Sequence, residues 1–228
     1  MRRLLLPLAA LVVFATAEPA HAGDLDLRAG AFVPRANTGS VNDLFTDDSA
    51  LYTVKKSDWT SFSGGVQYNF KVHRNVLFGF GLDFYDRTLQ TAYRSYQYPD
   101  GRDILQTLHF EIVPMSVELR FMPTSRRVKI APFAGVGGDL FYWRYEEYGY
   151  FVKFIDPKLP VINDSFFSEG WNGGLHVTGG VRFAVNDDIG IFGQFRYQWG
   201  TADMGYDFRG NRIDLSGASY LGGVNIRF

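Results

Sequence analysis

The most regular feature of the chain is an alternation of apolar side chains with polar or small ones, which recurs in short segments as far as Phe228. Successive side chains of a β-strand point to opposite faces, so each segment predicts a strand with two different faces. The last ten residues show this most clearly. Their apolar and aromatic parity holds Tyr220, Val224, Ile226 and Phe228, and the other parity holds Ser219, Gly223, Asn225 and Arg227.

Eight such segments follow one another, and the connections between them alternate in length. Long connections are expected at about residues 34–58, 86–103, 144–170 and 200–211, and short ones at 73–75, 122–127 and 186–188. An even number of strands joined by alternating long and short connections is typical of transmembrane barrels. The pattern therefore predicts an all-β fold, a transmembrane eight-stranded antiparallel up-and-down β-barrel.

One expected strand, at about residues 104–121, changes its pattern in the middle. Leu108 and Ile112 lie on one apolar parity, but Met115 and Val117 lie on the other. An extra residue in a strand reverses the face of every later side chain, and proline cannot donate to a strand ladder. The change therefore predicts a β-bulge at Pro114.

Charged side chains occupy the polar parity of the predicted strands, and this favours a membrane barrel over a soluble one. A soluble up-and-down barrel has an apolar interior, and a dry interior cannot hold many charges. In a membrane barrel the same parity lines the lumen, where acidic and basic groups can pair. The predicted lumen network consists of Asp26, Arg28, Asp83, Glu111, Glu118, Arg120, Asp139, Arg182, Arg196 and Arg227.

The tryptophans support the same orientation. Each of the four falls where a predicted strand meets a long connection, which is where an aromatic girdle would mark a membrane interface. The predicted girdle is Trp59, Trp143, Trp171 and Trp199.

The first 22 residues predict a cleaved secretory signal peptide. Arg2 and Arg3 precede an apolar run, and Ala20-His21-Ala22 resembles a cleavage site. Cleavage would leave residues 23–228 as one barrel domain. The sequence has no cysteine, which excludes disulfides and thiolate sites, and its formal net charge of −1 argues against a nucleic-acid partner.

Together with the terminal Phe228, the glycine-rich segment Ala131-Pro-Phe-Ala-Gly-Val-Gly-Gly138 resembles the small outer-membrane barrel superfamily that includes the OmpA transmembrane domain, OmpX and OmpW. The resemblance implies residence in the Gram-negative outer membrane, in contact with lipid and lipopolysaccharide. It also implies that the barrel-assembly machinery reads the C-terminal signal formed by Tyr220, Val224, Ile226 and Phe228. It implies no cofactor, and leaves any extracellular partner unknown.

Three functions are compatible with these features. A lumen filled by paired charges predicts a structural or surface-interaction protein without catalysis. Alternatively, inward glycines would leave a narrow, OmpW-like channel for small solutes, with loop aromatics such as Tyr148, Tyr150 and Phe154 either lining its entrance or packing on one another. The least favoured alternative is a lipid A or phospholipid enzyme, because His176 and Thr178 resemble a His-x-Ser pair but have no suitably placed acid.

Overall fold

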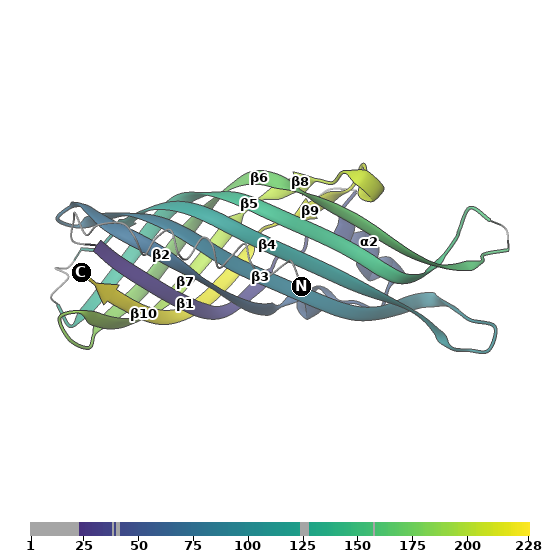
Figure 1. Ribbon diagram of the computed structural model, residues 1–228, viewed down its shortest axis with the longest axis horizontal. Helices are drawn as coiled ribbons and strands as arrows, with labels where there is room; N and C mark the ends of the chain where they lie inside the picture. The colour runs from purple at the N-terminus through teal and green to yellow at the C-terminus, as the bar shows by residue number, and fades with distance from the viewer. Residues whose placement is uncertain (1–22, 38, 40–41, 124–127, 157) are drawn as a thin grey trace.

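The computed structural model describes residues 23–37, 39, 42–123, 128–156 and 158–228. The predicted signal peptide, residues 1–22, lies outside the described residues. Eight antiparallel strands close into a barrel in the order β1-β10-β7-β6-β5-β4-β3-β2, which confirms the predicted fold (Figure 1). These strands are β1 (Gly23–Pro34), β2 (Ser61–His73), β3 (Val76–Gln97), β4 (Asp103–Phe121), β5 (Ile130–Val152), β6 (Val161–Ala184), β7 (Ile189–Trp199) and β10 (Gly217–Arg227).

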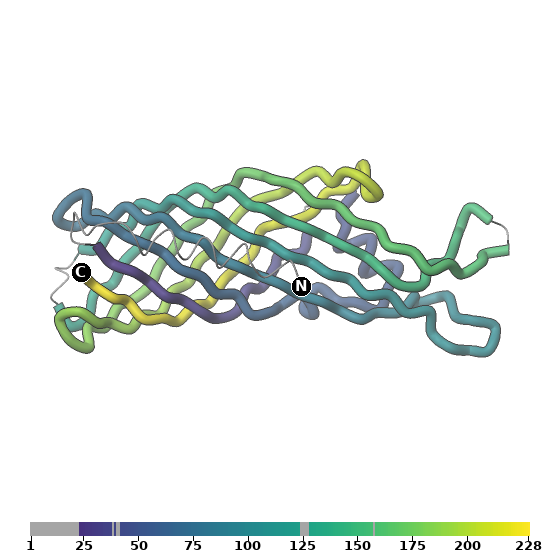
Figure 2. The backbone as a smooth tube through the Cα atoms, in the orientation of Figure 1, coloured from purple at the N-terminus to yellow at the C-terminus, as the bar shows by residue number. Residues whose placement is uncertain are grey.

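The two ends of the barrel differ. One end, here named the turn end, carries the short connections and both ends of the described chain, where the Phe228 backbone N–H donates to the Gly23 carbonyl at 3.0 Å. At the opposite end, named the hairpin end, β3 to β6 extend well past the other strands (Figure 2). The predicted long loops at 86–103 and 144–170 are therefore wrong for most of their length, because both regions continue as paired strands.

Short elements of the first and last long connections cover the hairpin end of the lumen. They are the helix α2 (Leu44–Leu51), the 3-10 turns η1 (Lys56–Trp59) and η2 (Tyr206–Phe208), and the two-stranded sheet of β8 (Thr201–Asp203) and β9 (Arg212–Asp214). The Asp43 carboxylate caps α2 by accepting from the Thr46 backbone N–H at 2.8 Å, which satisfies a donor that has no partner within the helix. Within the described ranges, no helix is long and apolar enough to cross a membrane.

The predicted β-bulge at Pro114 is wrong. The register between β3 and β4 is the same on both sides of it, since Leu82 faces Met115 and Tyr85 faces Ile112. Even-numbered side chains point into the barrel along the whole of β4, so the apolar parity changes because the surroundings change. Toward the turn end the outward residues are apolar, whereas toward the hairpin end the inward ones are.

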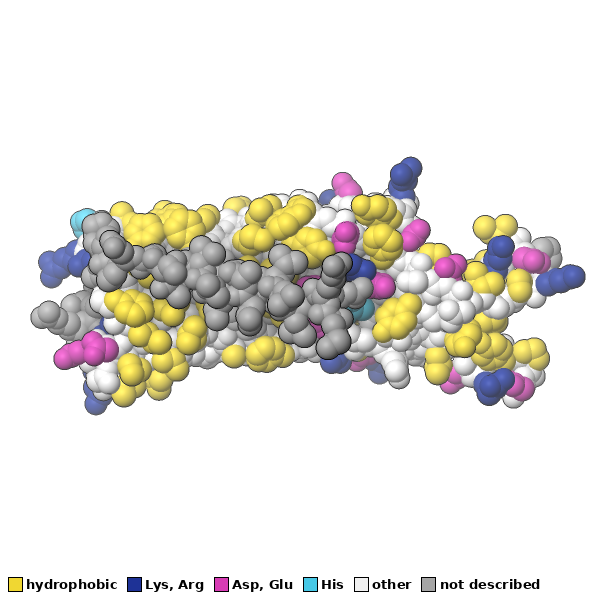
Figure 3. All heavy atoms as spheres, viewed as in Figure 1, with side chains coloured by type: hydrophobic (Ala, Val, Ile, Leu, Met, Phe, Trp, Pro, Cys, Tyr) yellow, Lys and Arg dark blue, Asp and Glu magenta, His cyan; other side chains and the backbone are white. Residues whose placement is uncertain are grey.

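Apolar side chains lie over much of the visible outside of the barrel toward the turn end, and charged side chains appear among them toward the hairpin end (Figure 3). Asp86, Glu111, Arg144 and Glu169 are direct cross-strand neighbours on β3, β4, β5 and β6, and they form a charged outward row. One step closer to the turn end, Val113, Tyr142 and Trp171 form an apolar and aromatic row. A membrane barrel carries such an aromatic rim where lipid meets water. The strand segments beyond the charged row are therefore outside the membrane-spanning part. Exposed apolar residues of the spanning part include Phe62, Phe80, Leu119, Val136, Leu175, Ile191 and Tyr220.

Candidate functional site

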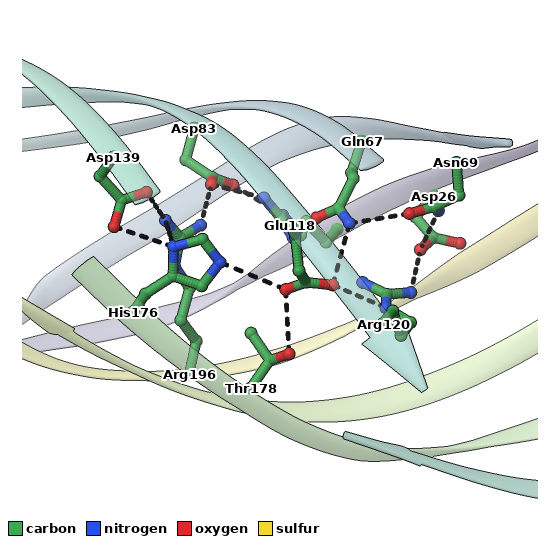
Figure 4. A network of polar contacts seen from close by, with 11 residues as sticks. Asp26, Gln67, Asn69, Asp83, Glu118, Arg120, Asp139, His176, Thr178 and Arg196 are labelled. Carbon is green, nitrogen blue, oxygen red and sulfur yellow. Dashed lines mark hydrogen bonds and ion pairs between the residues drawn. The ribbon is translucent and has the colours of Figure 1, made fainter. Parts of the chain in front are cut away.

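The middle of the lumen holds a network of buried charged side chains, named here the ionic layer (Figure 4). Asp83 of β3 is its first centre. Arg28 of β1 donates to Asp83 with two nitrogens, at 2.7 and 2.6 Å, and Arg196 of β7 donates to the same carboxylate at 2.8 Å. Arg196 also pairs with Asp139 of β5. These contacts cross the lumen and join strands that are not neighbours in the sheet.

A second centre lies closer to the turn end. Arg120 of β4 donates to Asp26 of β1 at 2.8 Å and to Glu118 at 2.8 Å. Gln67 of β2 links the two centres, because it donates to Glu118 at 3.2 Å and accepts from Arg28 at 2.6 Å. Buried charges are tolerated when they are paired and hydrogen-bonded, and these side chains provide such partners for one another.

His176 and Thr178 of β6 belong to this layer. The His176 Nδ1 lies 2.9 Å from Asp139, and its Nε2 lies 3.3 Å from Glu118. The Thr178 hydroxyl donates to Glu118 at 2.9 Å. The predicted lack of a suitably placed acid is wrong, because Asp139 and Glu118 both contact His176. Thr178 is 6% exposed, however, so its hydroxyl lies in a filled lumen that offers no access to a lipid substrate. The arrangement gives no support to the lipid-modifying enzyme alternative.

The structure places most of the predicted network residues in the lumen, but Glu111 is misplaced in the prediction. Glu111 points outward in the charged row, because β4 contains no bulge and odd-numbered residues face away from the lumen. Arg227 lies at the turn end, where it donates to Asn225 at 3.3 Å. Sequence reasoning missed several members of the layer, although they lie on the inward parity of their strands. These are Asp24, Gln67, Asn69 and Asn225.

The inward glycines do not leave a pathway. A Cβ atom on Gly137 would collide with the His176 ring, and one on Gly135 would collide with Thr178 and Glu118. Side chains of the ionic layer likewise fill the space over Gly65, Gly79 and Gly81. These glycines allow large polar groups to reach across the barrel.

Apolar layers close the lumen on both sides of the ionic layer. At the turn end, Leu77, Met122, Ala131 and Phe133 form a buried cluster, and the Arg120 guanidinium lies 4.5 Å from the Phe133 ring centre. At the hairpin end lies the aromatic layer, which comprises Phe32, Phe45, Trp59, Tyr85, Phe110, Phe141, Trp143 and Tyr145. Between it and the ionic layer lies a cavity of about 10 Å³, room for about one water molecule.

Two residues of the predicted tryptophan girdle lie in this aromatic layer. Trp59 is 1% exposed and Trp143 is 2% exposed, and both point inward. Trp59 precedes β2 and packs against Phe45 of α2 at 5.4 Å between ring centres. Trp171 and Trp199 lie on the outer surface, at 57% and 44% exposure. The prediction for Trp59 and Trp143 is wrong because the barrel wall extends past the membrane zone and surrounds a core of its own.

Two carboxyl groups are buried where α2 meets this wall. Asp48 of α2 and Glu147 of β5 are each 5% exposed. The Tyr145 hydroxyl lies 2.6 Å from Asp48 and 3.1 Å from Glu147. Burial raises the pKa of both carboxyl groups, because desolvation disfavours the charged form, and the charge of Glu147 raises the pKa of Asp48 further. Desolvation raises the pKa of Glu147 to about 7, although its hydrogen bonds act in the opposite direction.

Beyond the charged row, aromatic side chains cluster at the tips of the β3–β4 and β5–β6 hairpins, named here the aromatic crest. Tyr96 packs against Tyr93 and Phe154, with ring centres 5.9 and 5.2 Å away, and Tyr98 lies 6.4 Å from Tyr150. A tight turn joins β3 and β4, since the Gly101 N–H donates to the Tyr98 carbonyl at 2.9 Å. Residues of the crest that remain exposed include Tyr148, Tyr150, Phe154 and Ile155.

The outer wall has one further feature, an open groove of about 410 Å³ where β7 ends and β6 continues. Arg35, Leu175 and Trp199 are among its lining residues. Among the residues that the structure describes, no group of three or more His, Cys, Asp or Glu side chains is arranged to hold a metal ion.

An apolar exterior around a charged and filled interior defines the class of eight-stranded transmembrane β-barrels. No protein-family model matches the chain, and no curated protein matches it. Solved structures do match. Neisserial surface protein A is 14% identical, with a TM-score of 0.50 over 91% of this chain and 97% of that one. A major outer membrane protein from Thermus thermophilus is 12% identical, with a TM-score of 0.50 over 91% and 100%. The E. coli outer membrane protein W is 15% identical, with a TM-score of 0.40 over 92% and 100%. The two matches with a TM-score of 0.50 show that the chain shares the barrel fold of those proteins.

Proposed function

We propose that this protein is a surface-interaction barrel of the Gram-negative outer membrane, with its aromatic crest as the contact surface and no catalytic role. One observation carries the proposal. Side chains fill the lumen on both sides of the ionic layer, while the β3–β4 and β5–β6 hairpins hold aromatic side chains beyond the membrane zone. Exposed aromatic residues supply large contact areas at interfaces.

The outer surface supports the location and two of the expected partners. The apolar zone below the charged row fits contact with outer-membrane lipid, including lipopolysaccharide. In β10 the exposed Tyr220 and Val224 point outward, and Phe228 is also exposed. This placement suits recognition of the last strand by the barrel-assembly machinery. The outer-membrane fold of the matched structures agrees with the location.

The experiment that tests the proposal compares wild-type protein with a variant whose two hairpins are shortened. Replacing residues 94–103 and 150–161 with tight turns removes most of the crest. It leaves the ionic layer, the aromatic layer and the apolar cluster around Phe133 in place. Cells displaying each form are probed with a glycan array and with extracellular-matrix proteins. We expect binding by the wild type that the shortened variant loses. Equal binding by two folded forms would contradict the proposal.

A narrow channel for small apolar solutes is the second candidate, favoured by the groove beside Trp199 and Leu175. Gly174 and Gly200 separate this groove from the inward ring of Phe141. A route into the lumen would therefore require that ring to move. Uptake of a small apolar dye that falls on Phe141→Trp substitution and rises on Phe141→Ala would favour this candidate.

A further inference from the structure

The contact between α2 and the barrel wall contains two buried carboxyl groups with tyrosine hydroxyls between them, and the surface role does not require these groups. Asp48 and Glu147 contact the same Tyr145 hydroxyl oxygen, at 2.6 and 3.1 Å. The Tyr52 hydroxyl lies 3.2 Å from the second oxygen of Glu147. One hydroxyl oxygen can hydrogen-bond to two carboxyl groups only when at least one of the acids carries a proton. Tyr145 has a single hydroxyl proton, so it cannot donate to both acids at once.

The direct hydrogen-bond partners of the two acids are tyrosine hydroxyls, which carry no positive charge. Tyr52 and Tyr145 contact the pair directly, and the Tyr93 ring lies 5.1 Å from the Tyr52 ring. Asp43 and Asp47 of α2 add further negative charge. From η2, Phe208 packs on Tyr145 at 5.4 Å between ring centres, and from β4 the Phe110 ring lies 6.4 Å away. Ionisation of both acids would therefore place two like charges in a buried site.

The same contact holds the first long connection over the lumen. Phe45, three residues before Asp48, packs against Phe110 of the wall at 5.5 Å. The Tyr52 N–H donates to the Asp48 carbonyl at 2.7 Å and ends the helix. Arg94 of β3 donates to the Ser49 carbonyl at 2.9 Å, but this contact is exposed. Asp48 is thus the buried polar link between α2 and β5.

We infer that Asp48 and Glu147 form a proton-dependent latch, which holds α2 against the barrel wall while the pair retains a proton and releases it when both acids ionise. Folded-state pKa values raised by burial stabilise the closed form in acid, and that stabilisation is lost as the pH rises through neutral. The raised pKa of Glu147, about 7, agrees with this direction. The inference stands independently of the proposed surface role.

Acrylamide quenching of the buried tryptophans tests the latch. In a background carrying Trp171→Phe and Trp199→Phe, emission reports only on Trp59 and Trp143, which lie in the layer that α2 covers. Between about pH 5 and about pH 10, we expect the quenching constant of the refolded protein to rise several-fold. The variants Asp48→Asn and Glu147→Gln should abolish this rise, because one carboxylate beside an amide can remain paired at high pH.

Asp47→Asn is the matched control, because Asp47 is exposed on the same helix. Removing its negative charge should keep the rise in quenching and move it only to lower pH. Heat-modifiable gel mobility establishes which variants are folded, and a misfolded Asp48→Asn leaves Glu147→Gln as the decisive variant. A flat wild-type profile would overturn the inference. An unchanged response in folded Glu147→Gln protein would also overturn it.

Discussion

At the residue scale, the ionic layer depends on charged groups that have lost their water. Arg28 lies in the lumen with its guanidinium directed at Asp83 and Gln67, and the Arg28 and Asp83 side chains are 0% and 6% exposed. Forming such a pair in a barrel contributes little net stability, because desolvation opposes the attraction. Removing one partner is costly, because the other charge stays buried without compensation.

We therefore expect Arg28→Leu to lower the free energy of unfolding by about 3 kcal/mol. The matched control is Arg102→Leu at the exposed Arg102–Asp100 pair, 2.7 Å apart, where the loss should be much smaller because water screens the two charges. Urea unfolding in lipid vesicles, followed by tryptophan emission, measures both variants. Equal losses would show that the lumen around Arg28 is hydrated.

At the scale of elements, β3 to β6 pass through two environments without a break in register at the charged row. Below the charged row their outward side chains face lipid, and beyond it their inward side chains face the aromatic layer. Glu111, Trp59 and Trp143 were misassigned for this one reason. The sequence-based prediction takes the apolar face of each strand as the outer face along the whole barrel, and this holds only below the charged row.

Single-tryptophan variants in vesicles of brominated lipid would check this assignment. Bromine on the acyl chains quenches only tryptophans near lipid, so Trp171 and Trp199 should lose emission. Trp59 and Trp143 should keep theirs, because the barrel wall separates them from the membrane. Strong quenching of Trp143 would show that its side chain faces lipid, which would contradict its inward orientation in β5.

At the scale of the whole molecule, the lumen is closed in three successive layers, of which α2 contributes to one. We expect the refolded mature barrel to show no discrete openings in planar bilayers. Deleting residues 39–55, which removes α2, should also give a silent barrel, because the ionic layer and the cluster around Phe133 remain. Regular openings in the deletion variant alone would identify α2 as the sole barrier. Openings in both forms would favour the channel function.

The sequence by itself determined the strand count, the inward position of Asp83, Glu118 and Arg196, and the outward, exposed face of the last strand. These follow from a strict period of two, because adjacent side chains must take opposite faces. Periodicity cannot say which face is covered, since lipid and a protein core favour the same side chains. Only the tertiary structure decided where the apolar side chains of β4 change faces. They point outward from Val113 toward the turn end and inward from Ile112 toward the hairpin end. There the outward neighbours change from lipid to water and the inward neighbours from charged groups to aromatic rings.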